Sequence, residues 1–283
     1  MKFRALASTC AIVAFAGVAA NADPADDTLV INGEIPIVTH TDAAPPYIEG
    51  LTEQYSGWHF READTRAMEQ DDFDNPGMLG VEAAAANWNE VDGTAGKACA
   101  SCHEAPESMA GVRTQMPKYS EAKGTMMTLE MYINECRTER MGAEAWGWDD
   151  AAMVNMTALI SSVSRGLPMN VAVDGPAAPY WEQGKEMYYT RYGQLELSCA
   201  NCHEDNYGNY IRADHLSQGQ INGFPVYRLK DAKLSSIHNR FKGCVRDTRA
   251  ETFKPGSPEF IALEVYVASR GNGLSVESPS IRN

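Results

Sequence analysis

Hydrophobic residues recur at helical spacing in two successive parts of the chain. In the first part an alanine-rich segment at 80–88 is followed by predicted helices over residues 129–140 (closed by Gly142) and 149–166. The last of these carries Met153, Met156, Ile160 and Val163 on one face. The fold class predicted by this pattern is mainly α.

A second set of helices follows in the same order. The segment at 179–192 corresponds to that at 80–88, and helices are expected from Leu234 through Ile237 and Phe241 to near Gly243, and from an N-cap at Ser257 to Gly271. The two closing helices end alike, at residues 164–166 and 269–271, both Ser-Arg-Gly. The chain is therefore expected to contain a duplicated unit, with residues 168–179 as the linker.

The N-terminus has a different pattern. Lys2 and Arg4 precede an apolar stretch over residues 5–20, and Ala20-Asn21-Ala22 is a small-residue cleavage pattern, which predicts a signal peptide at 1–22 and a periplasmic protein. Cys10 would leave with the signal, and no later run is long enough for a membrane span. Residues 23–56 read as an extension with short strands near 28–31 and 35–38. The two units then occupy residues 57–174 and 175–283.

Charge excludes one class of partner. The chain has 24 Lys and Arg against 38 Asp and Glu, a formal net charge of −14. A protein this acidic is a poor nucleic-acid binder, and an anionic substrate would need a local basic pocket.

One motif occurs in both units. Cys99-Ala-Ser-Cys102-His103 and Cys199-Ala-Asn-Cys202-His203 both have the Cys-x-x-Cys-His pattern of c-type haem attachment, in which two thiols bind the vinyl groups and the histidine binds the iron. A zinc site or a redox dithiol would explain the cysteine pairs but not the repeated histidine. The sequence therefore predicts two covalently bound haem c groups, in two tandem cytochrome c-like domains behind the N-terminal extension.

Two other cysteines, Cys136 and Cys244, follow the two motifs at equivalent positions. They are candidate second axial ligands, although a disulfide between them is the alternative. The second unit has no methionine after its motif, so its ligand is Cys244, His215, His238, a residue from elsewhere, or nothing. In the first unit five methionines after the motif are available as ligands, which makes the case for Cys136 weaker: Met116, Met126, Met127, Met131 and Met141.

Together these motifs and the string Asn239-Arg240-Phe241-Lys242-Gly243-Cys244 resemble SoxA, the dihaem subunit of the SoxAX cytochromes of sulfur oxidation. The resemblance covers the mature chain. It implies His103 and Cys136 as axial ligands of haem 1, His203 and Cys244 as those of haem 2, a persulfide on catalytic Cys244, and Arg240 as the substrate-binding residue.

The resemblance also implies a reaction, the oxidative conjugation of thiosulfate to a cysteine of a SoxYZ-like carrier protein. This is the activity of an L-cysteine S-thiosulfotransferase. The electrons would pass to a monohaem SoxX-like partner in a heterodimer and then to a soluble cytochrome c. Four further cations of the second unit are expected to be surface charges rather than ligands: Lys242, Arg246, Arg249 and Arg270.

Two other functions compete with this one. A non-catalytic dihaem electron-transfer cytochrome would use Cys136 and Cys244 as passive ligands. A dihaem peroxidase would keep an open or labile distal position at one haem.

Overall fold

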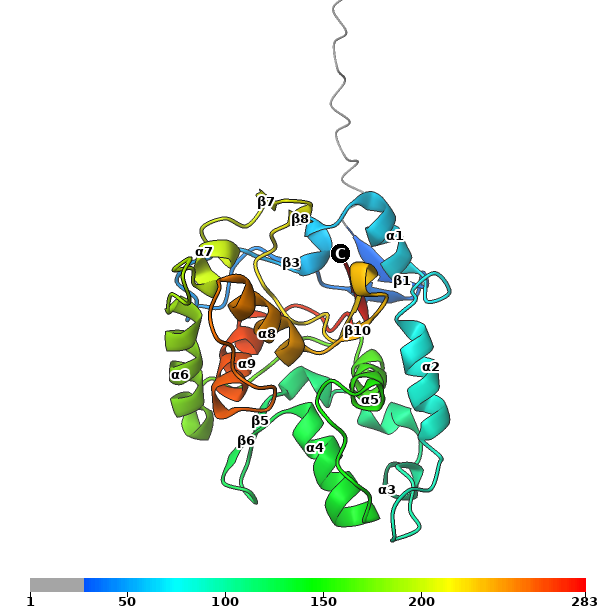
Figure 1. Ribbon diagram of the computed structural model, residues 1–283. Coiled ribbons are helices and arrows are strands. Elements are labelled where there is room, and N and C mark those ends of the chain that lie inside the picture. Colours follow the sequence, from blue (N-terminus) through cyan, green and yellow to red (C-terminus); the bar gives the residue numbers. More distant parts are fainter. Residues whose placement is uncertain (1–27) are drawn as a thin grey trace, which may run out of the picture.

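The computed structural model describes residues 28–283 (Figure 1). The predicted signal peptide and Cys10 lie outside the described residues. Within them, no helix is long and apolar enough to cross a membrane.

The N-terminal extension forms two small hairpins. Strands β1 (Leu29–Ile31) and β2 (Ile35–Ile37) pair antiparallel where strands were predicted, and β3 (His40–Thr41) pairs with β4 (Gln54–Tyr55). The turn η2 (Gly57–Phe60) and helix α1 (Ala63–Gln70) follow. Helix α1 packs on the C-terminal strand β11 (Ser280–Arg282), so the extension joins the two ends of the described chain.

The first unit is built on two helices that pack along each other, α2 (Met78–Asn87) and α5 (Ala151–Ser162). Between them come short helices α3 (Ala100–His103), η3 (Pro106–Met109) and η4 (Arg113–Gln115), and the hairpin of β5 (Lys118–Ser120) and β6 (Thr125–Met127). Helix α4 (Leu129–Glu135) continues as a π-helical turn, η5 (Cys136–Met141), which ends at Gly142 as predicted.

The second unit repeats this plan. Its packed pair is α6 (Ala178–Tyr189) and α9 (Pro258–Arg270), preceded by the turn η6 (Gly175–Ala177) and separated by α7 (Cys199–His203) and α8 (Ile237–Asp247). Strands β7 (Tyr210–Ile211) and β8 (Asp214–His215) form a hairpin. A sheet of order β10-β9-β11 contains β9 (Val226–Arg228) and β10 (Lys233–Ser235), joined by η7 (Leu229–Asp231).

The predicted duplication is therefore visible in the fold. Figure 1 shows the pair α2 and α5 on one side of the molecule and the pair α6 and α9 on the other. The motif helices α3 and α7 lie at opposite ends of this arrangement (Figure 1). Each helix pair contributes to its own hydrophobic core. One core contains Met153 and Leu159, and the other contains Phe260 and Tyr266.

Both ends of helix α8 differ from those predicted from the sequence. Leu234 lies in strand β10, and the helix begins only after Ser236, whose hydroxyl accepts a hydrogen bond from the amide of Asn239. The helix also continues through Gly243 to Asp247, because Val245 is buried and holds the next turn against the core. Cys244 is consequently inside the helix, not on a turn behind it.

Helix α5 is shorter than predicted. It begins after Asp150 and ends at Ser162, and the chain to Gly166 forms turns. The prediction for the second closing helix is confirmed, with Ser257 as N-cap and Gly271 just past the end.

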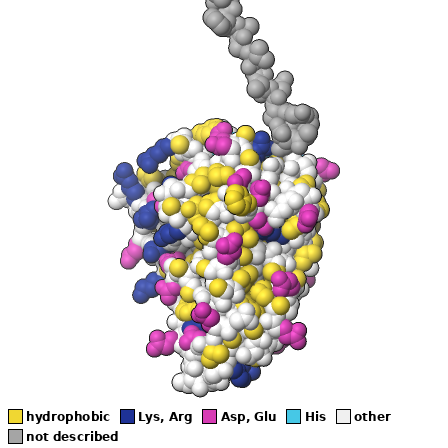
Figure 2. All heavy atoms as spheres, turned by 90° about the vertical axis from the view of Figure 1, so that its right-hand side faces the viewer, with side chains coloured by type: hydrophobic (Ala, Val, Ile, Leu, Met, Phe, Trp, Pro, Cys, Tyr) yellow, Lys and Arg dark blue, Asp and Glu magenta, His cyan; other side chains and the backbone are white. Residues whose placement is uncertain are grey.

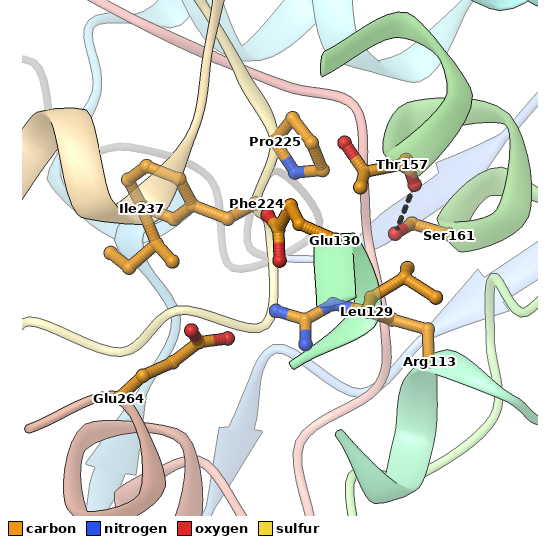
Figure 3. A pocket seen from close by; sticks show the side chains of 9 residues that line it. All are labelled: Arg113, Leu129, Glu130, Thr157, Ser161, Phe224, Pro225, Ile237 and Glu264. Carbon is orange, nitrogen blue, oxygen red and sulfur yellow. Dashed lines mark hydrogen bonds between the residues drawn. The ribbon is translucent and has the colours of Figure 1, made fainter. Parts of the chain in front are cut away.

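The two units meet at a buried polar cluster. Arg113 and Glu130 of the first unit and Glu264 of the second line a small cavity of about 10 Å³, the room of roughly one water molecule. Figure 3 shows the Arg113 guanidinium directed between the two carboxylates. His238 lies beside this cluster, with Nε2 3.0 Å from Glu264 Oε2.

Candidate haem and sulfur-transfer site

The second haem motif forms the short helix α7, and its local sequence explains why. Ser198 is the N-cap, and its side chain and that of Asn201 make a reciprocal capping box. The thiols of Cys199 and Cys202 and the ring of His203 are thereby set on one rigid turn. Asn201 thus has a structural function in the spacer of the motif.

His203 is oriented for iron binding. Its Nδ1 lies 2.7 Å from the carbonyl oxygen of Ser217, and because a carbonyl only accepts, Nδ1 carries the hydrogen and Nε2 is left as ligand. Desolvation lowers the pKa of His203 to about 4, which keeps the ring neutral. Gly219 packs on the ring with a φ of +78°, where a Cβ would come 2.8 Å from Cγ of His203.

Cys244, on helix α8, lies within electrostatic range of both motif thiols. Burial raises the pKa of Cys199 to about 12, and the charge of Cys244 contributes to this shift, as it does to the raised pKa of Cys202. Two attachment thiols, an imidazole and a facing cysteine are a donor set that fits a covalent haem c with a thiolate as second axial ligand.

Arg240 precedes Cys244 by one helical turn. Cys244 is the foremost cause of the raised pKa of Arg240, ahead of the opposing effect of burial. No hydrogen bond or ion pair of the Arg240 guanidinium to the rest of residues 28–283 is found. Its charge is therefore free for a ligand next to Cys244.

The first unit assembles the same groups with one difference. Cys136 raises the pKa of Cys99, and Cys102 in turn raises that of Cys136, although burial is the largest cause in both. Cys136 therefore lies near the motif of its own unit. Four residues before it stands Tyr132, where the second unit has Arg240.

The structure speaks against the alternative ligands. The six described cysteines form no disulfide, and Cys136 and Cys244 lie near different motifs. The Nδ1 of His238 accepts from the amide of Gly256, its Nε2 faces Glu264, and its ring stacks on Trp148. His215 stacks on Tyr210, and its Nε2 lies 2.9 Å from the carbonyl of Gly208.

One prediction about the cations is wrong. Lys242, Arg246 and Arg249 are exposed as expected, but Arg270 is fully buried and paired with Glu204. Its guanidinium lies over the ring of Tyr188. The equivalent residue of the first unit, Arg165, is likewise buried and paired, with Asp72. The repeated Ser-Arg-Gly ends were the sequence signal for two buried arginines.

Two further arginines were not singled out from the sequence, Arg61 and Arg228. Both interact electrostatically with Arg240. Neither belongs to a motif, and only the fold brings them near Arg240; Arg228 is also within electrostatic range of Cys244.

Two helical units, each with a Cys-x-x-Cys-His helix facing a cysteine, define the class as c-type cytochromes. The family model of the SoxA/TsdA cytochrome c domain matches residues 83–169 and 183–276. The chain therefore belongs to the SoxA/TsdA cytochrome c family, and a chain of this family binds haem c.

Similar proteins narrow this to SoxA. The L-cysteine S-thiosulfotransferase subunit SoxA of Paracoccus pantotrophus is 60% identical over 98% of this chain and 97% of its own length. That of Rhodovulum sulfidophilum is 59% identical, with 95% and 94% covered. A chain in the crystal structure of SoxXA from P. pantotrophus matches with a TM-score of 0.89 at 60% identity, covering 92% of this chain and all of that one.

Proposed function

We propose that this chain is the dihaem subunit of a periplasmic L-cysteine S-thiosulfotransferase, which joins thiosulfate oxidatively to a cysteine of a SoxYZ-like carrier protein. The observation that carries the proposal is that Cys244 and Arg240 share one helix next to the second haem motif, and that Arg240 has no ion pair within residues 28–283. The names and near full-length similarity of the SoxA relatives support it.

The reaction can be written in two balanced steps at Cys244. Thiosulfate bonds through its sulfane sulfur to the Cys244 thiolate and gives Cys–S–S–SO₃⁻, with the loss of two electrons. The carrier thiolate then attacks the sulfane sulfur, takes the S–SO₃⁻ group, and releases the Cys244 thiolate by thiol–disulfide exchange. If Cys244 carries a persulfide, its terminal sulfur bonds to thiosulfate and is released in these two steps instead of the Cys244 thiolate.

Each residue has a separate task in this scheme. Arg240 binds the sulfonate with its planar fork of donors and offsets the repulsion between two anions. Cys199 and Cys202 would attach haem 2, and His203 and Cys244 would bind its iron. When bound, this haem would supply an acceptor through which the two electrons of the oxidative step leave one at a time.

The first unit is assigned to electron transfer. Cys99 and Cys102 would attach haem 1, and His103 and Cys136 would bind its iron, which would give the chain two covalent haems. Tyr132 stands where Arg240 stands in the second unit, so no equivalent cation binds a sulfonate next to Cys136.

A monohaem SoxX-like subunit is the proposed partner, in a heterodimer that passes electrons to a soluble cytochrome c. The face around α2, turned toward the viewer in Figure 2, carries hydrophobic side chains among scattered acidic groups. Along α2 and its flanking turns, Phe73 is 95% exposed, Leu79 70% and Val91 66%. An apolar surface of this kind is typical of a protein interface.

The proposal is tested by reconstitution. The chain, purified with its haems and its partner, is mixed with thiosulfate, a carrier protein ending in a reactive cysteine, and oxidised cytochrome c. We expect two cytochromes reduced per carrier modified, and a carrier mass increased by one S-thiosulfonate group. Cytochrome reduction without carrier modification would support the plain electron carrier instead, and rapid turnover of hydrogen peroxide would support the peroxidase.

A further inference from the structure

Most buried arginines of this protein have a partner within the described chain. Arg137 pairs with Asp92, Arg165 with Asp72, Arg270 with Glu204, and Arg282 with Glu69 and Glu277. Arg113 donates to two backbone carbonyls. This is the expected pattern, because an unpaired buried charge is costly.

Arg228 departs from this pattern. It is only 6% exposed, and its Nε is buried without a hydrogen-bond partner. Its guanidinium makes no ion pair within residues 28–283. Arg228 ends β9, the central strand of its sheet, between Lys233 of β10 and Arg282 of β11 in the register. Its backbone position is therefore fixed, and its side chain stays buried.

The neighbours of Arg228 lead to Cys244. Burial is the largest cause that lowers the pKa of Arg228, Arg240 lowers it further, and Cys244 acts in the opposite direction. Arg61 adds a third cation to this region. One end of its guanidinium donates to the carbonyl of His215, and its Nε is also buried without a hydrogen-bond partner.

The acidic groups nearby form no ion pair with these arginines. Asp214 acts on Arg61, Arg228 and Arg240, Asp231 acts on Arg228, and Asp247 acts on Arg240. In the described part of the chain, none of the three aspartates forms an ion pair with any of the three arginines. The guanidinium groups of Arg61, just after η2, of Arg228 on β9 and of Arg240 on α8 thus lie within electrostatic range of one another, and the last two lie within range of Cys244.

We propose that Arg228, with Arg61 beside it, binds an oxyanion next to Cys244, separately from Arg240. Two oxyanions have the matching chemistry. One is the sulfonate of thiosulfate, an assignment that rests on the proposed function, and the other is a propionate carboxylate of haem 2. The carboxylate and the sulfonate each present two neighbouring oxygens that can accept the paired hydrogen bonds of a guanidinium.

The test uses the haem-loaded complex and two variants, Arg228→Gln and Arg228→Lys. The matched control is Arg246→Gln, which removes an exposed arginine of α8 paired with Asp247. For each protein we would measure the KM for thiosulfate and the midpoint potential of haem 2 between pH 5 and 9. For Arg228→Gln we expect a tenfold or greater rise in KM, or a shifted potential with a changed pH dependence, and for Arg228→Lys a smaller effect.

The two readouts separate the two oxyanions. A raised KM with an unchanged potential would show that Arg228 binds the sulfonate of thiosulfate. A shifted potential with a KM within twofold of wild type would show that it binds the haem propionate. If both quantities stay at the values of the Arg246→Gln control, no anion binds Arg228 and the inference is overturned. A wild-type complex without thiosulfate turnover would refute the proposed function alone, because the potential of haem 2 still tests the site.

A third variant covers the case in which Arg228→Gln does not fold. Arg228→Met keeps the apolar stem and removes a charge that would be unpaired without an anion. If an oxyanion pairs with Arg228, the haem-loaded Arg228→Met protein should unfold at a lower temperature than wild type. An unchanged or higher unfolding temperature would overturn the inference.

Discussion

Arg240 and Cys244 stand one turn apart inside a continuous helix, α8, and Cys244 is the largest cause of the raised pKa of Arg240. Side chains four residues apart lie on the same helix face. Whatever binds the guanidinium is therefore held beside the sulfur. In the first unit the same spacing joins Tyr132 to Cys136, which restricts this combination of anchor and nucleophile to the second unit.

This relationship predicts the effect of removing the anchor. Arg240→Ala should keep both haems and lower kcat/KM for thiosulfate by about one to two decades, because one charged hydrogen-bonded contact contributes roughly 1.5–3 kcal/mol. Arg240→Lys should recover part of the loss, since it keeps the charge without the fork. Steady-state kinetics at low salt measure this, with exposed Arg246→Ala as control. An Arg240→Ala enzyme within twofold of wild type would remove Arg240 from the site.

Gly243 gives a prediction about the helix itself. It lies inside α8, its φ is not positive, and a Cβ there would meet no atom within 4 Å. Gly243→Ala should therefore raise the free energy of unfolding by about 0.5–1 kcal/mol, through helix propensity. Gly142→Ala is the opposite control, because Gly142 has a φ of +64° and a Cβ would press on Thr94. Denaturant unfolding measures both, and a destabilised Gly243→Ala would mean that the helix ends there.

The buried cluster between the units predicts a pH dependence. Burial raises the pKa of Glu130, and Glu264 adds to the shift. The folded state then holds the proton more tightly than the unfolded chain, so the contribution of Glu130 to stability is full below the unfolded pKa and is lost as pH rises through the folded pKa. Glu130→Gln should gain stability relative to wild type as pH rises from about 4 to 7.

Glu139 is the matched control for this measurement. Lys123 lowers the pKa of Glu139, so its contribution is present above the unfolded pKa and lost in acid. Glu139→Gln should therefore show the opposite trend with pH in thermal unfolding. Parallel trends in the two variants would contradict the assignment of a raised pKa to Glu130.

The apolar face around α2 predicts a contact with the partner. Leu79→Glu, on the exposed side of α2, should weaken the complex with the monohaem subunit at least tenfold, because it places a charge in an apolar contact. Leu195→Glu, an exposed leucine of the second unit, should leave the affinity unchanged. Analytical ultracentrifugation measures both. Equal affinity of the two variants would place the interface elsewhere.

The repeat and the haem motifs could be read from the sequence because they depend on local spacing. Helix starts with a capping side chain followed by proline, as at Ser257, were also predictable. The ends of α8 were not, because tertiary packing overrides local signals: Leu234 pairs in a sheet, and Val245 carries the helix past Gly243.

The proximity of Arg61 and Arg228 to Arg240 could not be predicted from the sequence, because it also depends on tertiary packing. Arg61 and Arg228 are far apart in sequence and belong to no motif. Only the assembly of η2, β9 and α8 brings them into electrostatic range of Arg240. Burial of Arg270 was foreseeable from the repeated Ser-Arg-Gly ends, but the general rule that arginines are exposed pointed the other way.

The most direct test of the account is the turnover of Cys244→Met, compared with Cys136→Met, in the thiosulfate- and carrier-dependent reduction of cytochrome c. Both variants keep the two Cys-x-x-Cys-His motifs, so each should retain two covalent haems. We expect Cys244→Met to lose thiosulfate turnover and carrier modification entirely, while Cys136→Met still modifies the carrier at a changed rate of electron transfer. Near-normal turnover of Cys244→Met, with the carrier modified, would contradict the central claim that the sulfur of Cys244 takes part in the reaction.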